Sequence, residues 1–419
     1  MNRLTTVLLG CCWLCTLGAA RAQGKLTGVV QDSVTHAPLA FASVFLANTT
    51  LGVTTTEQGQ FEFARVPAGR YDVVGSYVGY RLAKQAVTVA AGAAPQQLTL
   101  RLAPTGNQLG EVVVQPAPNK PEDFKKFTAM FLGGTTFSAQ CHLSNPDQVR
   151  VLYDDSTQEL TARAKEFAQV DNDALGYRLK YYGLQFDYDA DDQTISYYGE
   201  PVFEELKPRD EAQRRLWAAN RLAAYTGSPM HFLRSVYRNR LRPEGFLTQQ
   251  MRLVPNPRFE RADARRRALQ AARPAGDFTP AEQDSLAKWG REVPAFAKLS
   301  PAALPIDSVR RVSADGQHTY LRFTGELQVT HFGEAPDPRY GRPMSSLGAT
   351  ARPYPGLRQV SRLKLRGREA EIQANGAPLN PLDVLNGEYW GFERIGEFLP
   401  FDYQPPAAVR REAPAKPAP

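Results

Sequence analysis

The sequence predicts an α+β chain in which a β-rich N-terminal part precedes a mixed β/α region. Apolar and polar residues alternate with the period of a strand between residues 24 and 104. Apolar residues recur at helical spacing over 211–241, and the alternation returns between residues 319 and 403. We therefore expect an antiparallel β-sandwich, followed by a region that contains a helical hairpin and a C-terminal β-rich part.

The first 22 residues are typical of an export signal. Arg3 precedes the apolar run TTVLLGCCWLCTLGA, and Ala20-Arg21-Ala22 places small residues where a signal peptidase cleaves. The run is shorter than the roughly 18 residues that a membrane span needs, which disfavours the alternative of an uncleaved anchor. We expect residues 1–22 to be removed as a signal peptide.

Charge and hydropathy restrict the classes of partner. The chain has a formal net charge of +7, and the loss of Arg3 and Arg21 with the signal lowers it to +5. Such mild basicity outside the cytoplasm favours an anionic lipid or polysaccharide surface over nucleic acid. No apolar run after Ala22 is long enough to span a membrane, so we expect no transmembrane span in the mature chain.

The cysteines exclude an intramolecular disulfide. Three of the four precede the predicted cleavage point, and the mature chain keeps only Cys141. His142 follows it, but neighbouring side chains on a strand point to opposite faces. We expect Cys141 to be a buried, inert thiol.

Turn residues divide the N-terminal part into strands. The runs KLTGVVQD, AFASVFLA and QFEFARV alternate and are separated by turns. Gly59 and Gly69 suit tight turns, and Pro67 fixes the backbone just ahead of Gly69. Strands of this length, separated by such turns, fit a small antiparallel sandwich at residues 24–104.

These positions resemble the carboxypeptidase regulatory-like domain, a transthyretin-like β-sandwich. The matching positions are Gly28-x-Val30-x-Asp32, Pro38-Leu39, Ala42-x-Val44, Gly52-x-x-Thr55, Gly59-x-Phe61-x-Phe63, Val66-Pro67-x-Gly69-x-Tyr71 and Val78-Gly79-Tyr80. A wider likeness, through FLGG, YTGSPMHFLR and FLPFDY, is to Gram-negative envelope proteins that share this domain. Similar domains also precede TonB-dependent outer-membrane receptors, where a segment like LGEVVV follows, here at 109–114. No long series of about 10-residue membrane strands comes after it, so a receptor is disfavoured.

The histidines argue against a zinc carboxypeptidase. Zinc catalysis needs three protein ligands and an open position for water. The histidines are His36, His142, His231, His318 and His331. Only His331-Phe332-Gly333-Glu334 has the H-x-x-E spacing of the metallocarboxypeptidase ligand pair, and no histidine follows Glu334. We assign no catalytic, cofactor-binding or metal-binding residue and expect no cofactor.

One acidic stretch has part of a calcium-loop pattern. Asp187, Asp189 and Asp191 have the spacing with which such loops begin, but Asp192 replaces the required glycine and Tyr198 the final glutamate. We interpret this stretch as a polar hairpin tip between two aromatic strands. A weak cation site at residues 187–192 remains an alternative.

The remaining chain is expected to form one mixed domain. A linker over 105–126, rich in proline and charge, precedes the mixed β/α domain at 127–403. EAQRRLWAANRLAAYTG and PMHFLRSVYRNRL predict two helices, with Gly227 ending the first and Ser228 capping the second. RFERADARRRALQAARPAG predicts a basic helix, and EYWGFERIGEFLPFDY predicts strands and turns. Residues 404–419 form a Pro-rich tail that is expected to be disordered.

Together these patterns favour a non-catalytic, exported cell-envelope protein. We expect a periplasmic, outer-membrane-associated or cell-surface location, and an envelope protein or glycan as partner of the β-sandwich. An accessory or relative of TonB-dependent uptake machinery is one alternative. A zinc-dependent carboxypeptidase is the other, on the H-x-x-E spacing alone.

Overall fold

The computed structural model describes residues 23–90, 92, 94–105, 119–190, 194–274, 276–341 and 358–406. Two compact units are found among them. Residues 23–44 and 53–105 form the first unit, and residues 45–52 and 119–406 form the second. The predicted signal peptide and the LGEVVV segment lie outside the described residues, as does the tail beyond residue 406.

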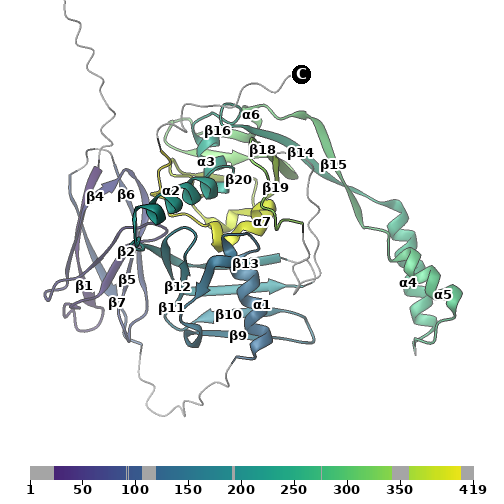
Figure 1. Cartoon of the computed structure of the whole chain (residues 1–419), viewed down its shortest axis with the longest axis horizontal. Coiled ribbons are helices and arrows are strands. Elements are labelled where there is room, and N and C mark those ends of the chain that lie inside the picture. The colour runs from purple at the N-terminus through teal and green to yellow at the C-terminus, as the bar shows by residue number, and fades with distance from the viewer. Residues whose placement is uncertain are drawn as a thin grey trace, which may run out of the picture. The chain divides into compact units, whose positions relative to one another are not determined.

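The N-terminal part is a two-sheet β-sandwich (Figure 1). Its strands are β1 (Gln23–Asp32), β2 (Ser43–Leu46), β3 (Gly52–Thr54), β4 (Gln60–Pro67), β5 (Gly69–Ser76), β6 (Ala83–Val89) and β7 (Gln96–Leu102). One sheet has the order β4-β1-β7 and the other β3-β2-β5-β6. The β1–β4 and β5–β6 pairs are antiparallel, whereas β1 and β7 run parallel from Leu26 opposite Gln96 to Asp32 opposite Leu102.

Burial in the sandwich confirms the predicted period. Every second residue of β1 is buried, including Leu26 and Val30. Side chains that alternate in this way across a strand give one face to the core between the sheets. The second strand is shorter than the alternating run suggested, because Phe41 has φ 60° and is 65% exposed. A positive φ is incompatible with strand geometry, and β2 therefore begins at Ser43.

The first part of the second unit is a six-stranded sheet covered by a helix (Figure 1). Its elements are α1 (Pro121–Leu132), η1 (Ser138–Gln140), β8 (Cys141–Leu143), η2 (Pro146–Gln148), β9 (Val149–Tyr153), β10 (Leu160–Ala164), β11 (Phe167–Asn172), β12 (Tyr177–Asp189) and β13 (Thr194–Glu205). The strand order is β8-β11-β12-β10-β9, with β13 also paired to β12. Phe127 and Phe131 of α1 are fully buried against Phe186 of β12.

Helix α1, which the sequence patterns did not predict, begins inside the stretch 105–126 suggested as a linker. Pro121 occupies the first turn, where its missing N–H costs nothing. Glu122 and Asp123 lie in the same turn, where their negative charges interact favourably with the positive end of the helix dipole. A Pro-rich, charged stretch is thus a helix start here, and any linker ends before Pro121.

The predicted helical hairpin is confirmed. It consists of α2 (Glu211–Tyr225) and α3 (Pro229–Tyr237). The Ser228 side chain accepts a hydrogen bond from the backbone N–H of His231, and Gly227 has φ 78°. Helical spacing in the sequence predicts an apolar stripe of Leu216, Ala219, Leu222 and Ala223, but the buried residues of α2 are Trp217, Ala224 and Tyr225. Leu216 is 57% exposed, while Trp217 is buried.

The second part of this unit contains a five-stranded sheet of order β15-β14-β18-β19-β21 and a three-stranded sheet of order β16-β17-β20. The strands are β14 (Phe246–Pro255), β15 (Ala295–Ala303), β16 (Arg310–Val312), β17 (Thr319–Arg322), β18 (Glu326–Phe332), β19 (Arg358–Leu365), β20 (Glu369–Ile372) and β21 (Val384–Glu388). The short helices are α6 (Ile306–Val309), η3 (Pro381–Asp383), α7 (Tyr389–Glu393) and η4 (Arg394–Glu397). Residues 389–397, predicted as strands and turns, are therefore helical.

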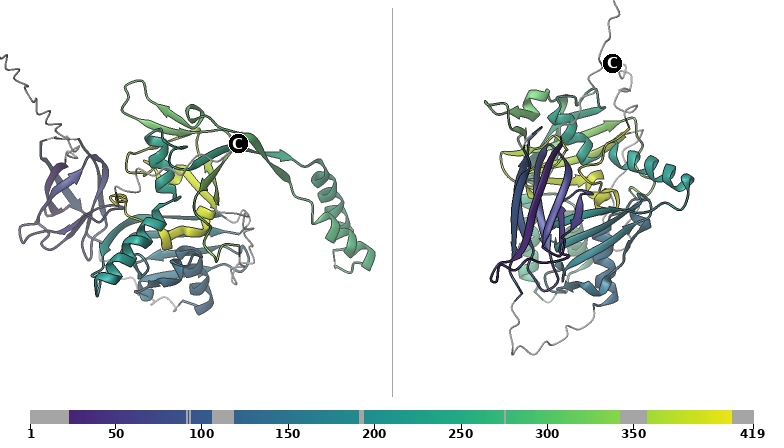
Figure 2. Two further views of the ribbon diagram at one scale, coloured as in Figure 1. Left: turned by 45° about the horizontal axis from the view of Figure 1, so that its top comes forward. Right: turned by 90° about the vertical axis from the view of Figure 1, so that its left-hand side faces the viewer.

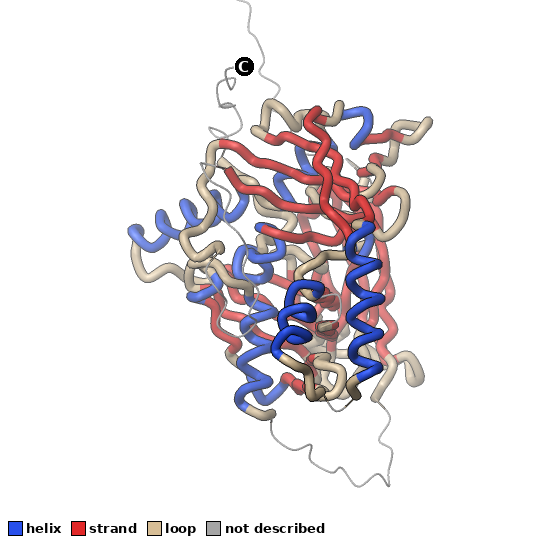
Figure 3. The backbone as a smooth tube through the Cα atoms, turned by 90° about the vertical axis from the view of Figure 1, so that its right-hand side faces the viewer, coloured by secondary structure: helices blue, strands red, loops and turns tan. Residues whose placement is uncertain are grey.

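Strands β14 and β15 continue as a two-stranded ribbon that carries two helices at its end (Figures 2 and 3). These are α4 (Pro257–Ala272), the predicted basic helix, and α5 (Pro280–Trp289), which lies beside it. In α4 only Ala262 and Asp263 are buried. Arg266 and Arg267 both pair with Asp263, so part of the basic character is neutralised within the helix.

Candidate functional site

Helix α7 and the turns around it form the centre of the candidate site. Trp390 fixes the helix on both sides, because its backbone N–H donates to the Ser361 hydroxyl (3.2 Å) and its indole N–H to the Gly227 carbonyl (2.8 Å). The flanking residues Glu388 and Arg394 have φ of 58° and 47°. Such values are rare for non-glycine residues and persist only where the surroundings impose them. Tertiary contacts therefore determine this helix.

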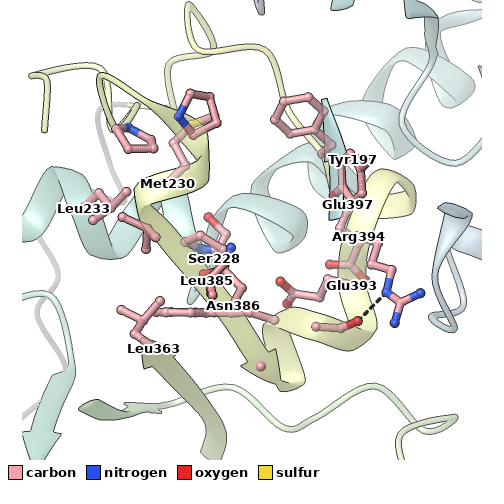
Figure 4. A pocket seen from close by; sticks show the side chains of 18 of the residues that line it. Tyr197, Ser228, Met230, Leu233, Leu363, Leu385, Asn386, Glu393, Arg394 and Glu397 are labelled. Carbon is pink, nitrogen blue, oxygen red and sulfur yellow. Dashed lines mark hydrogen bonds between the residues drawn. The ribbon is translucent and has the colours of Figure 1, made fainter. Parts of the chain in front are cut away.

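A cavity of about 700 Å³ adjoins α7. Most of the side chains that line it are apolar or aromatic, and they include Tyr181, Met230, Leu233, Leu363, Leu385, Trp390 and Phe392. Figure 4 shows Met230, Leu233 and Leu363 on one side, and Glu393, Arg394 and Glu397 on the other. Cavities of this size, with apolar walls and a few converging polar groups, are typical of small-molecule binding sites.

The carboxyl groups at the polar end favour their neutral form. Burial raises the pKa of Glu393 well above its usual range, and the nearby Glu397, Glu334 and Asp337 raise it further. Burial also raises the pKa of Glu397 to about 7 and that of Glu334 to about 8. Among the described residues, no ion pair includes Glu334, Glu393 or Glu397. Ionising more than one of these acids at once would therefore be costly.

Arg394 does not neutralise these acids. Its Nε donates to the Gly391 carbonyl at 2.6 Å, as Figure 4 shows, and its Nη1 donates to the Met130 carbonyl. Burial lowers the pKa of Arg394. Its guanidinium therefore links a carbonyl of α1 to a carbonyl of α7.

His331 and Glu334 of the H-x-x-E spacing lie at the end of β18 and just after it. The strand ends at Phe332, and Gly333 (φ 100°) turns the chain before Glu334. Burial raises the pKa of Glu334, and the Gln359 side chain offsets part of this rise. Burial lowers the pKa of His331 to about 4, assisted by His231. No group of three His, Cys, Asp or Glu side chains able to hold a metal ion occurs in the described parts of the chain.

A tight polar contact lies beside His331. The His331 Nδ1 and the Gln359 Oε1 are buried and find no hydrogen-bond partner within the described residues. Both face Gly227, where an added Cβ would lie 2.3 Å from the Gln359 Oε1 and 3.0 Å from the His331 Nδ1. Only glycine fits there, both for space and for its positive φ.

Cys141 is placed as expected. It is 7% exposed, and burial raises the pKa of its thiol to about 12. The neighbouring His142 lies on the exposed side and pairs with Asp173 at 3.5 Å. A neutral, buried thiol is a poor nucleophile.

The acidic stretch 187–192 is only partly described. The hairpin of β12 and β13 predicted around it is present. Asp187 pairs with Arg163 at 2.6 Å, so this carboxylate already has a cation. Asp191 and Asp192 lie outside the described residues, and the cation-site alternative stays a prediction.

Sequence reasoning assigned a binding role to none of the cavity residues. The one signal that was present is the spacing of Glu393 and Glu397, four residues apart within an aromatic segment. On a continuous helix this spacing would place both carboxyls on one face, but here Arg394 (φ 47°) separates α7 from η4. The sequence analysis interpreted this segment as strands and turns. In strands and turns, the spacing of Glu393 and Glu397 does not indicate that their carboxyls lie together.

Comparison with known proteins identifies the N-terminal part alone. Residues 26–114 match the CarboxypepD_reg-like domain, in agreement with the β-sandwich. The resemblance to TonB-dependent receptors is not shown. No curated protein matches the chain. No helix in the described residues is long and apolar enough to cross a membrane.

Solved structures give only distant likenesses. The pilus 2b backbone protein of group B streptococcus is 22% identical over 21% of this chain and 43% of its own, with a TM-score of 0.18. A variant of the shaft pilin SpaA from Lactobacillus rhamnosus GG is 16% identical over 20% of this chain and 48% of its own, with a TM-score of 0.17. BcpA, the major pilin subunit of Bacillus cereus, is 13% identical over 44% and 69%, with a TM-score of 0.16. This chain spans less than half of the first two, and such TM-scores carry no argument about function.

Proposed function

We propose that this chain is an exported cell-envelope binding protein without catalytic activity, whose second unit holds a small molecule in the cavity beside α7. The CarboxypepD_reg-like sandwich serves as an interaction module for an envelope protein or glycan. The sequence of residues 1–22 supports export.

The observation that carries the proposal is the composition of the cavity. Its apolar walls offer burial to an apolar molecule, and Glu393, Arg394 and Glu397 lie together on one side, where they would orient it. The ionisable groups there are held in neutral forms by burial, as the raised pKa values of Glu393 and Glu397 show. Carboxyls in the neutral form can both donate and accept hydrogen bonds, which suits them to holding a polar group of a bound molecule.

The proposal is tested by titrating the purified protein with Nile red, a neutral apolar dye whose fluorescence rises on burial. We expect saturable binding at one dye per chain. Leu385 lines the cavity and is 36% exposed, so Leu385→Trp should fill the space without disturbing the core. This variant should bind at least about tenfold more weakly, which corresponds to about 1.4 kcal/mol.

The matched control is Leu379→Trp. Leu379 is 38% exposed and does not line the cavity, so binding should be unchanged. Equal binding by the wild type and Leu385→Trp would reject the cavity as the site. N-terminal sequencing of the protein from cell envelopes tests export, and we expect the mature chain to start at Gln23.

A further inference from the structure

The polar end of the cavity has an excess of acid. Glu393 and Glu397 line the cavity, and Glu334 and Asp337 lie close enough to repel them. In the lining, Arg394 is engaged with two backbone carbonyls. The other cations of the lining, Arg362 and Lys364, belong to β19, and Arg362 pairs with Glu326 and Glu388. At the end formed by Glu393 and Glu397 the electrostatic complement is therefore a positive charge.

Among the side chains that line the cavity, Glu393 gives the strongest indication of what the cavity binds. It is 5% exposed and lines the cavity, yet its carboxyl makes no hydrogen bond or ion pair among the described residues. A buried polar group without a partner is costly, by more than a typical hydrogen bond contributes. In native proteins such groups are usually paired, and a cationic group of a bound molecule would supply that pair here.

We propose that the occupant is an amphiphilic amine, with an apolar body along Met230, Leu233 and Leu363 and a protonated amino group held between Glu393 and Glu397. This inference rests on the proposed binding function and names its ligand class. An anionic amphiphile is disfavoured, because its head group would meet the same carboxyls.

Binding of such an amine is linked to proton release. The groups that face Glu393 are Glu397 on η4, Glu334 and Asp337 after β18, and Tyr389 on α7, none of which is a cation. In the empty cavity burial keeps the Glu393 carboxyl protonated. When the ammonium enters, one carboxyl gives its proton to solvent and pairs with the ammonium, which stays protonated throughout. One proton is released per amine bound.

The test compares two probes with the same apolar body, n-decylamine and n-decanol, by calorimetric titration of the full chain at pH 6. Each titration is run in two buffers with different ionisation enthalpies, so that proton release is measured directly. We expect decylamine to bind about tenfold or more tightly than decanol and to release about one proton. In Glu393→Gln we expect the preference and the proton release to disappear, while decanol still binds.

Two controls separate the ligand class from the site itself. Glu204→Gln removes an exposed carboxylate that pairs with Lys180, and the preference for decylamine should remain. Leu385→Trp should weaken both probes. If decanol binds as tightly as decylamine and Leu385→Trp weakens both, the cavity binds ligands but the amine assignment is overturned. If neither probe binds, the proposed binding function fails as well.

Discussion

Replacing Glu334 by glutamine should make the second unit more stable, by an amount that grows with pH. The folded protein raises the pKa of Glu334 from the ordinary 4.5 to about 8, chiefly through burial. Below pH 4.5 the carboxyl is protonated in the folded and the unfolded chain, and it contributes no pH dependence. As the pH rises towards 8, the unfolded chain releases the proton and the folded chain retains it, so the wild type loses stability.

The magnitude follows from the two pKa values. The interval from 4.5 to about 8, at about 1.4 kcal/mol per unit, corresponds to about 5 kcal/mol. Glu334 is only half-buried, and the solvent that reaches it screens part of this cost. We therefore expect Glu334→Gln and the wild type to be similar at pH 4.5, and the variant to be more stable by about 2–4 kcal/mol at pH 8.

Urea denaturation followed by tryptophan fluorescence measures this difference. Trp217, Trp289 and Trp390 all belong to the second unit, so the signal of the mature chain reports on it alone. Comparing the variant with the wild type at each pH also cancels the contribution of His331 to the pH dependence of stability, because both proteins contain it. Its lowered pKa of about 4 makes both proteins lose stability as the pH falls below 6.5.

A control of opposite sign is Glu369→Gln. The hydrogen bond from Arg311 lowers the pKa of Glu369, so the ionised carboxylate stabilises the fold above pH 4.5. This variant should lose stability relative to the wild type as the pH rises. A Glu334→Gln difference that is constant with pH, or that favours the wild type at pH 8, would refute the reasoning.

Three further outcomes follow from the packing of the second unit. Phe131→Ala should lower the free energy of unfolding by about 3–5 kcal/mol in urea denaturation, because Phe131 is fully buried. Leu216→Ala, at a 57% exposed position, should change it by less than about 0.5 kcal/mol, and equal losses would contradict the burial assignment. Cys141 should resist a thiol reagent at pH 8 until urea unfolds the chain, and rapid labelling of the native protein would contradict its burial. Arg234→Met should cost about 3 kcal/mol and speed proteolysis at residues 398–406, since the buried guanidinium donates to the carbonyls of Phe401 and Tyr403. Unchanged cleavage in limited proteolysis would show that these bonds do not hold the segment.

The features that sequence patterns predicted are those decided by local chemistry. Alternation along β1 fixes which face is buried, and Gly227 and Ser228 set the boundary between α2 and α3. The buried face of α2 could not be predicted from local sequence patterns. Trp217 packs on Gly176 and donates to the Asp173 carbonyl at 2.7 Å, a partner distant in sequence. The helix is therefore oriented by that turn.

The candidate site was hidden for the same reason. Its lining comes from segments as far apart as Tyr181, Met230, Leu363 and Glu393, which only the fold brings together. Helix α7 has no capping side chain and is bounded by non-glycine residues with positive φ. Neither the helix nor the buried state of Glu393 has a local signature, because both depend on what packs around them.

The parallel pairing of β1 with β7 has a mechanical consequence. The strand pair begins where the chain enters the sandwich, at Gln23, and ends where the chain leaves it, after Leu102. A pull between these two points runs along both strands and loads their hydrogen bonds together, in shear, instead of peeling them apart one at a time. If the N-terminal end were anchored, traction would pass through the sandwich along its most resistant direction.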